Sequence, residues 1–385
     1  IVLTIDSQRK PAEGVLWKGS TTTEWDYLTK NFSANGKDSY FVTGDKVVFD
    51  DSADNFNVSL NNTVMAGSIE FRNDEKTYTF TGDGSISGTG DLIKNGKGEV
   101  RLLAEESNFT GRTIINEGRL TVSKMANAGK TSSIGAPVAD KGYLQINGAE
   151  LAIDGDNVAT DRMITITDTC SLDVVNAGSG FTMNSQISGE GVLVKQGDGQ
   201  LNFSYAGENA FSAIVVRQGR INQGSWKATF GKAGCPMYLE GGSVSLIANN
   251  GMTTTPNLNH QFYAKEGTAS NIIGSFRSNI TGAAHGKGTI QITSGGARCY
   301  VSTDFSDFEG TLVGSGAELL LTDKVTDMKR ATLNPTGSCG VSPAASTLSI
   351  GTLTSNDKEA AIGGTTVNAG YLNQDSKFAG IIKCK

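Results

Sequence analysis

The chain has 385 residues, of which 49 are glycine and only 6 are proline, and it carries a formal net charge of −6 at pH 7. The high glycine content without a glycine at every third position excludes collagen, and the 37% of hydrophobic residues excludes a disordered tail. Basic residues are not in excess, so the chain is not expected to bind nucleic acid through its charge.

The first 80 residues lack the internal repeat that marks the rest of the chain, and they hold two of its three tryptophans, Trp17 and Trp25. A stack of strands leaves an unpaired edge at each end, and such edges are usually covered by a cap. We therefore expect residues 1–80 to form an N-terminal capping segment. All of residues 50–55 except Ala53 have oxygen-bearing side chains, but this segment lacks the glycine and the glutamate of a calcium-binding EF-hand loop and is interpreted as a polar turn between strands.

An internal repeat follows this segment. Residues 86–102 and 187–203 are identical at eight of 17 positions, and weaker copies lie further along the chain. Within the repeat, aliphatic and aromatic residues alternate with polar ones and are bounded by Gly, Asn, Asp and Ser, which predicts short strands. No segment has the apolar spacing of a long helix. Repeats are accordingly expected near residues 86–122, 187–221, 280–321 and 348–382.

Repetition distinguishes between two all-β architectures. A β-sandwich gains nothing from repeating one motif, whereas in a solenoid each turn stacks on an equivalent turn and shares one continuous core. We therefore predict an all-β fold in which residues 81–385 form a right-handed parallel β-helix, or solenoid, behind the N-terminal cap. The repeat fades over residues 222–280, so an insertion that carries function is expected there, because binding residues often lie on the loops of a rigid scaffold.

The ends of the chain and its cysteines add further expectations. The chain begins at Ile1 without a recognisable signal peptide, contains no apolar run as long as a transmembrane helix, and stops within a strand-like segment. We expect it to be a piece of a longer polypeptide. Its five cysteines are widely spaced and form no Cys-x-x-Cys pair, so no zinc site is predicted. The cysteines are expected to fill interior positions, and a single disulfide between two of them is left as an alternative.

The residues of the first repeat resemble a known family. Residues 86–102, followed by 108–120 (NFTGRTIINEGRL), are similar to the autotransporter-associated β-strand repeat of bacterial surface passenger proteins. The lead-in around Trp17 and Trp25 and the late segment Phe378–Ile382 resemble the same pattern. The resemblance implies a secreted β-helix of the bacterial cell surface. It does not imply one activity, because this repeat is a scaffold shared by adhesins, proteases and other passengers.

Few residues point to catalysis or to a metal. Only two histidines are present, His260 and His285, no Gly-x-Ser-x-Gly elbow occurs, and the Gly-x-Gly strings are not followed by a helix. No metal site and no cofactor is therefore predicted. Scattered carboxylates leave a glycosidase open, because the distance between two carboxylates does not follow from sequence. Lys94 and Lys195 occupy equivalent repeat positions, which favours a structural role in which the aliphatic stem covers apolar surface.

Exposed aromatic rings are common platforms for sugars, and four residues are candidates for ligand binding. They are Trp226, Tyr205, Tyr263 and Tyr300, although side chains of these types are also common in protein cores. The tripeptide 51–53 (DSA) resembles a short acceptor pattern of bacterial O-glycosylation, so Ser52 is a candidate modification site.

These observations favour a non-catalytic function. We predict a secreted, extracellular β-helix, exposed on the bacterial cell surface, that acts as a structural, adhesive or binding module. Its partners would be other cell-surface or outer-membrane proteins, or an extracellular polysaccharide, and not nucleic acid. Two alternatives stay open. One is a polysaccharide lyase or glycoside hydrolase on a β-helix scaffold, and the other is a non-catalytic subunit of an outer-membrane glycan-uptake or surface assembly.

Overall fold

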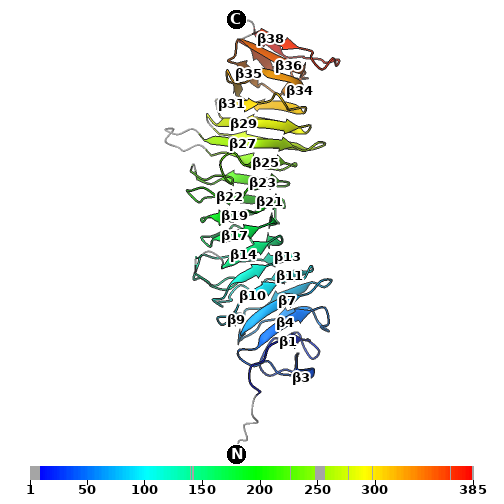
Figure 1. Cartoon of the computed structure of the whole chain (residues 1–385), viewed down its shortest axis with the longest axis vertical. Helices are drawn as coiled ribbons and strands as arrows, with labels where there is room; N and C mark the ends of the chain where they lie inside the picture. Colours follow the sequence, from blue (N-terminus) through cyan, green and yellow to red (C-terminus); the bar gives the residue numbers. More distant parts are fainter. Residues whose placement is uncertain are drawn as a thin grey trace, which may run out of the picture. The chain divides into compact units, whose positions relative to one another are not determined.

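A computed structural model describes residues 9–138, 140, 143–225, 227–247, 256–275, 277–296, 298–364 and 366–383. All regular elements formed by these residues are β-strands (Figure 1), which confirms the predicted all-β class. The chain divides into two compact units, Ile1–Val192 and Leu193–Lys385. In each unit the strands of successive turns are parallel neighbours, so the predicted parallel β-solenoid is confirmed. Its handedness stays a prediction.

The N-terminal unit contains two main series of parallel strands. The first is β1 (Val15–Trp17), β4 (Lys46–Asp50), β7 (Ser68–Arg72), β10 (Leu92–Lys94), β12 (Thr113–Ile115), β14 (Leu144–Asn147), β17 (Ile164–Thr167) and β20 (Ile187–Ser188). The second is β5 (Asn57–Ser59), β8 (Tyr78–Thr81), β11 (Glu99–Leu102), β13 (Arg119–Val122), β15 (Glu150–Ile153) and β18 (Thr169–Val174). Shorter parallel pairs are β6 (Thr63–Met65) with β9 (Ser85–Ser87) and β16 (Val158–Thr160) with β19 (Gly180–Met183).

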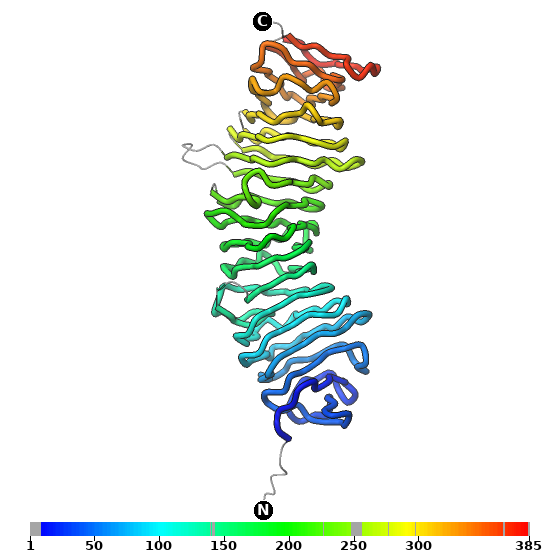
Figure 2. The backbone as a smooth tube through the Cα atoms, viewed as in Figure 1, coloured from blue at the N-terminus to red at the C-terminus, as the bar shows by residue number. Residues whose placement is uncertain are grey.

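The C-terminal unit repeats this plan, and Figure 2 shows its successive backbone turns. One series of parallel strands is β23 (Ala213–Val216), β25 (Pro236–Leu239), β27 (Asn257–Ala264), β29 (Asn279–Gly286), β31 (Cys299–Asp304), β33 (Glu318–Leu321), β35 (Gly340–Pro343), β37 (Ala361–Gly363) and β39 (Ile381–Lys383). The other is β22 (Gln200–Phe203), β24 (Arg220–Gln223), β26 (Ser243–Ser245), β28 (Ala269–Gly274), β30 (Thr289–Ser294), β32 (Thr311–Gly316), β34 (Asp327–Pro335), β36 (Thr347–Leu353) and β38 (Thr366–Ala369).

Strands of neighbouring turns pair in register, so equivalent residues lie above one another. Val100 pairs with Leu120, Leu120 with Leu151, and Leu151 with Leu172, and all four side chains are buried. Because neighbouring strands are about 4.8 Å apart, such apolar columns pack without gaps. These columns form the core of the solenoid.

Two repeat glycines show why the copies are alike at the turns. Gly88 and Gly189 occupy equivalent positions, and their φ angles are 118° and 98°. A Cβ atom at either residue would press against a carbonyl oxygen of the preceding turn, that of Ala66 for Gly88 and that of Ile166 for Gly189. Only glycine meets both requirements, so the identity of the two copies at this point follows from the geometry of the turn.

Aromatic rings fill the core at the start of the N-terminal unit. Phe49 is fully buried, and its ring centre lies 5.1–6.0 Å from those of five other rings. These rings belong to Trp17, Trp25, Phe71, Tyr78 and Phe80. An antiparallel hairpin, β2 (Phe32–Ala34) with β3 (Lys37–Ser39), pairs with β1, and its Phe32 packs on both tryptophans.

The cysteines described by the structure lie in the interior. Cys170, Cys235, Cys299 and Cys339 are buried and free, which confirms for these four the expectation that lone cysteines fill the core. Cys384 lies outside the described residues. Burial raises the pKa of Cys299 to about 12 and that of Cys339 to about 11, so both thiols stay protonated at neutral pH.

The expected cap over residues 1–80 and the expected insertion over 222–280 stay predictions. In the first range, β1, β4 and β7 already pair in parallel register. In the second range, β25 to β28 also pair in register with their neighbours, while residues 248–255 lie outside the described part of the chain.

Replacement of Phe49 by alanine tests the aromatic cluster. Removing a fully buried ring is expected to lower the free energy of unfolding by about 3–5 kcal/mol, because the lost transfer energy adds to the cost of a cavity. Urea unfolding followed by tryptophan fluorescence measures this, since Trp17 and Trp25 lie in the cluster. Met65→Ala removes a side chain that is 46% exposed and should change stability little. Equal effects of the two substitutions would contradict the packing described above.

Candidate functional site

A stack of three rings lies on the outer face of the C-terminal unit. Tyr238 in β25 pairs with Tyr263 in β27, and Tyr263 pairs with His285 in β29. The ring centres are 5.1 Å apart in the first pair and 5.0 Å apart in the second, and the interplanar angle is 24° in both. We call these three residues the aromatic ladder. The three strands are neighbours in the series seen in Figure 1.

Strand geometry places these rings. The residues on either side of the two tyrosines (Met237, Leu239, Phe262 and Ala264) are buried, so the alternation of the strand directs both tyrosine rings outward. In-register pairing then sets the rings about one strand spacing apart, which is a favourable distance for offset stacking. The paired strands therefore fix the positions of the three rings, none of which lies in a loop.

The middle ring of the ladder presents its edge rather than its faces to the solvent. Tyr263 is covered by Tyr238 on one side and by His285 on the other, yet Tyr238 and Tyr263 remain 38% and 37% exposed. What a partner meets is a row of ring edges with two phenol hydroxyls and an imidazole. The His285 Nε2 atom lies 3.5 Å from Oε1 of Gln261. Such a row offers hydrogen bonds together with apolar area.

A charged row borders the ladder. Arg217, Glu240 and Lys265 directly follow β23, β25 and β27, one position beyond the paired residues. The Glu240 carboxylate lies 2.9 Å from Nε of Arg217 and 3.6 Å from Nζ of Lys265. Two cations therefore share one carboxylate beside the aromatic rings, so these three side chains together carry one positive charge.

The four aromatic residues predicted as ligand contacts do not come together. Tyr263 lies in the ladder. Tyr300 is on the same outer face, but it pairs with Asn279, which is six residues, or about 20 Å along the strand, from His285. Tyr205 follows β22 in a loop and is half-buried, and Trp226 lies outside the described residues. Binding by these residues stays a prediction.

Sequence reasoning missed Tyr238 and His285 as companions of Tyr263. The signal was their spacing, because 25 and 22 residues separate the three positions in the chain, each of which is one turn of the solenoid. The fading repeat predicts an insertion over residues 222–280, and that prediction hides the regular turns to which Tyr238 and Tyr263 belong.

Ser52 lies in the exposed turn that follows β4. Its hydroxyl donates to a carboxylate oxygen of Asp50 at 2.6 Å, and Nζ of Lys18 donates to its carbonyl oxygen at 2.6 Å. Modification of Ser52 stays a prediction.

The repeat lysines are buried along their whole length. Lys94 in β10 donates to the carbonyl oxygens of Gly96 and Glu117, and Lys195 in β21 (Val192–Gln196) makes equivalent bonds. Burial lowers the pKa of Lys94 to about 8, although nearby carboxylates oppose the shift. These lysines bind turn carbonyls of two successive turns, which assigns them to the scaffold.

One cysteine and one histidine also meet in the interior of the C-terminal unit. Sγ of Cys235 lies 3.6 Å from Nδ1 of His260, and both residues are buried. Burial raises the pKa of Cys235 to about 11 and lowers that of His260. The thiol therefore stays protonated at neutral pH, so this pair is unsuited to nucleophilic catalysis.

The described residues lack clustered metal ligands and long apolar helices. They contain no group of three or more His, Cys, Asp or Glu side chains that could hold a metal ion. Within the same ranges, no helix has the length and apolarity that a membrane span requires.

Comparison with known families finds a passenger-associated-transport repeat at residues 92–122, which correspond to β10 through β13. The chain is also similar to the adhesin BmaC autotransporter of Brucella suis biovar 1 (strain 1330), with 38% identity over 108 residues. This match covers 27% of the chain and only 3% of the adhesin. No solved structure matches. The predicted resemblance to a passenger-type repeat is thereby confirmed, together with a distant similarity to an autotransporter adhesin.

The buried ammonium of Lys94 predicts a pH-dependent stability. Between about pH 8 and the ordinary lysine pKa of 10.5, the unfolded chain still holds a proton that folded Lys94 has lost. The free energy of unfolding of the native chain should therefore rise with pH over this window relative to that of Lys94→Met. Below this window both states are protonated, and the difference should be constant.

Urea midpoints of the native chain and Lys94→Met, measured on both sides of this window, provide the test. Lys97→Met removes an exposed lysine of the same turn and controls for the loss of one surface charge. A difference between the native chain and Lys94→Met that does not change with pH would show that the buried ammonium keeps its proton.

Proposed function

We propose that this chain is part of a secreted passenger on the bacterial cell surface and acts as an adhesive or binding module. In this proposal the solenoid is the scaffold, and the aromatic ladder with its charged row is the contact surface. The passenger-associated-transport repeat supports an exported location, and the similarity to an adhesin supports a role in attachment. The observation that carries the proposal is the exposed ladder of Tyr238, Tyr263 and His285.

Pre-organisation makes the ladder suitable for binding. Each ring is held by the rings above or below it, so little side-chain entropy remains to be lost when a partner docks. Tyrosine combines apolar area with a hydroxyl and is enriched at binding surfaces for this reason. The positive edge formed by Arg217 and Lys265 would guide a partner that carries negative charge.

Retention on immobilised partners tests this function. The purified chain is passed over neutral polysaccharides, acidic polysaccharides and extracellular-matrix glycoproteins, and both retention and shortening of the polymers are measured. We expect retention without shortening. The double variant Tyr238→Ala/Tyr263→Ala should bind about tenfold more weakly, because it removes the ring edges and hydroxyls of the ladder.

The matched control is Tyr40→Ala, which removes a tyrosine that is 45% exposed and lies outside the ladder. This variant should bind as the native chain does, and circular dichroism should show that all variants are folded. Shortening of any polymer would contradict the adhesive function and support the lyase or hydrolase alternative. Retention that is unaffected by the double substitution would remove the ladder from the proposal.

A further inference from the structure

A groove lies on the outer face of the C-terminal unit near its last turns. It has a volume of about 400 Å³ and is lined along its length by Arg298, Glu318, Gly340, Ser342, Gly363 and Lys383. We call it the C-terminal groove. It extends over β33, β35, β37 and β39, which corresponds to about 14 Å across the strands.

The groove is open because its floor is made of small residues. Glu318 pairs with Gly340, while Ser342 is the partner of Leu320 on the same face. The intervening Val341 is buried, so Gly340 and Ser342 face outward. Larger outward side chains at these positions would fill the space.

Gly340 is not required by the backbone. Its φ is outside the left-handed region, and the nearest atom to a Cβ placed on it would be a carbonyl oxygen 3.9 Å away. Glycine within a strand lowers stability relative to alanine, and it often marks a place where a ligand or another backbone approaches closely. The open space above Gly340 therefore points to an occupant rather than to a packing need. Gly363 differs, because a Cβ there would strike the backbone of Lys383.

The rim of the groove is polar and carries a net positive charge. Nε of Arg298 lies 2.6 Å from a carboxylate oxygen of Glu318. Burial raises the pKa of Glu318, but hydrogen bonds from Ser342 and Arg298 outweigh this effect and lower the pKa below its usual value. Glu318 is therefore ionised at neutral pH.

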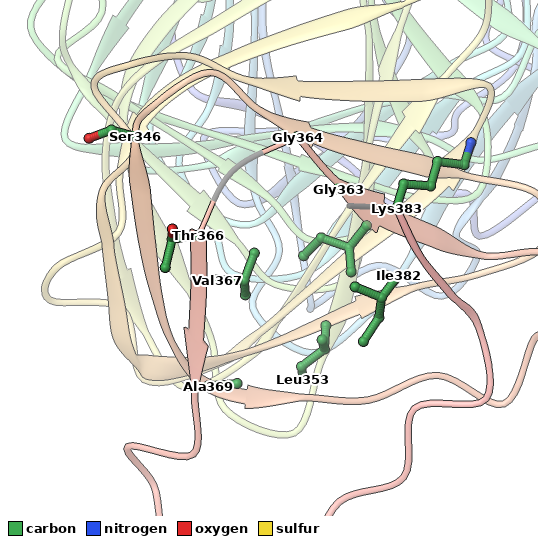
Figure 3. Close-up of a pocket in the computed structure, with 10 residues that line it drawn as sticks. Ser346, Leu353, Gly363, Gly364, Thr366, Val367, Ala369, Ile382 and Lys383 are labelled. Carbon is green, nitrogen blue, oxygen red and sulfur yellow. The ribbon is translucent and has the colours of Figure 1, made fainter. Parts of the chain in front are cut away.

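A second cation lies at the far end of the groove. Lys383 in β39 is exposed, and Figure 3 shows its side chain pointing away from the apolar cavity into which Leu353 and Ile382 point. Arg298 and Lys383 thus flank a groove that contains one carboxylate, in a chain whose net charge is −6. This local excess of positive charge favours an anionic ligand.

We propose that the C-terminal groove binds a short stretch of an acidic polysaccharide. Arg298 and Lys383 pair with carboxylates of separate sugar units, while Glu318 and Ser342 bond to ring hydroxyls and Gly340 lets the chain of sugars approach the sheet. Tyr300, whose strand partner Leu320 lines the groove, lies at its edge. The proposal rests on the binding function proposed above and assigns a ligand class to a site separate from the aromatic ladder.

Calorimetric titration of the purified chain with oligogalacturonate tests this site, with a neutral dextran oligomer and poly-L-glutamate as comparison probes. We expect oligogalacturonate to bind and the other two to bind much more weakly. Gly340→Leu should weaken binding by about tenfold or more, because the added side chain fills the groove without striking the backbone. Lys383→Gln should also weaken binding and reduce its dependence on salt.

Gly178→Leu is the matched control. Gly178 is exposed, is not in the left-handed region, and has no atom within 4 Å of a Cβ placed on it. The Gly178→Leu variant should bind oligogalacturonate as the native chain does. Undiminished binding by folded Gly340→Leu, equal binding of poly-L-glutamate, or no binding of oligogalacturonate would each overturn the proposal. If any of these results is obtained but retention that depends on the aromatic ladder persists, only the groove proposal fails. If that retention is also absent, both the groove proposal and the proposed binding function fail.

Discussion

In-register hydrogen bonding between parallel strands places each side chain directly above its counterpart in the next turn. In the interior, an apolar side chain must therefore lie above another apolar side chain, as in the column of Val100, Leu120, Leu151 and Leu172. At the surface it permits amide stacks, such as Asn116 donating to Asn95 at 2.7 Å. In-register pairing also stacks the outward tyrosines of the aromatic ladder, so the same strand pairing orders both the core and the candidate site.

The turns obey a second rule, which is that every polar backbone group removed from water needs a partner. Lys94 and Lys195 satisfy turn carbonyls of their own turn and of the following turn, and Gly88 and Gly189 allow the chain to pass close to the preceding turn. These requirements repeat with the turn, which is why four glycines and one lysine are among the identical residues of the two copies. Core columns accept any apolar side chain of suitable volume, so some core positions differ between the copies, such as Val100 and Leu201.

These two rules explain what sequence could and could not predict. Repeated glycines and alternating apolar residues led correctly to an all-β parallel solenoid, and the four cysteines that the structure describes were correctly placed in the interior. The aromatic ladder could not be predicted from spacing alone, because turns differ in length, with 25 residues between Tyr238 and Tyr263 but 22 between Tyr263 and His285. Only the register of the strands shows that these positions coincide. The C-terminal groove likewise depends on pairing between Glu318 and Gly340, which no local pattern reveals.

Function on such a scaffold is best sought where a residue departs from what the scaffold needs. Threonine, asparagine or a long charged side chain is suitable at an outward position on a solenoid, as the outward residues of most strands illustrate. Tyr238 and Tyr263 expose ring area that contributes little to the core, and Gly340 gives up strand stability without any steric demand. Both departures lie on one outer face of the C-terminal unit, where ordered strands hold side chains at fixed spacing. A partner with repeating chemistry can engage several such positions at once, and weak contacts along a regular face then add to useful affinity.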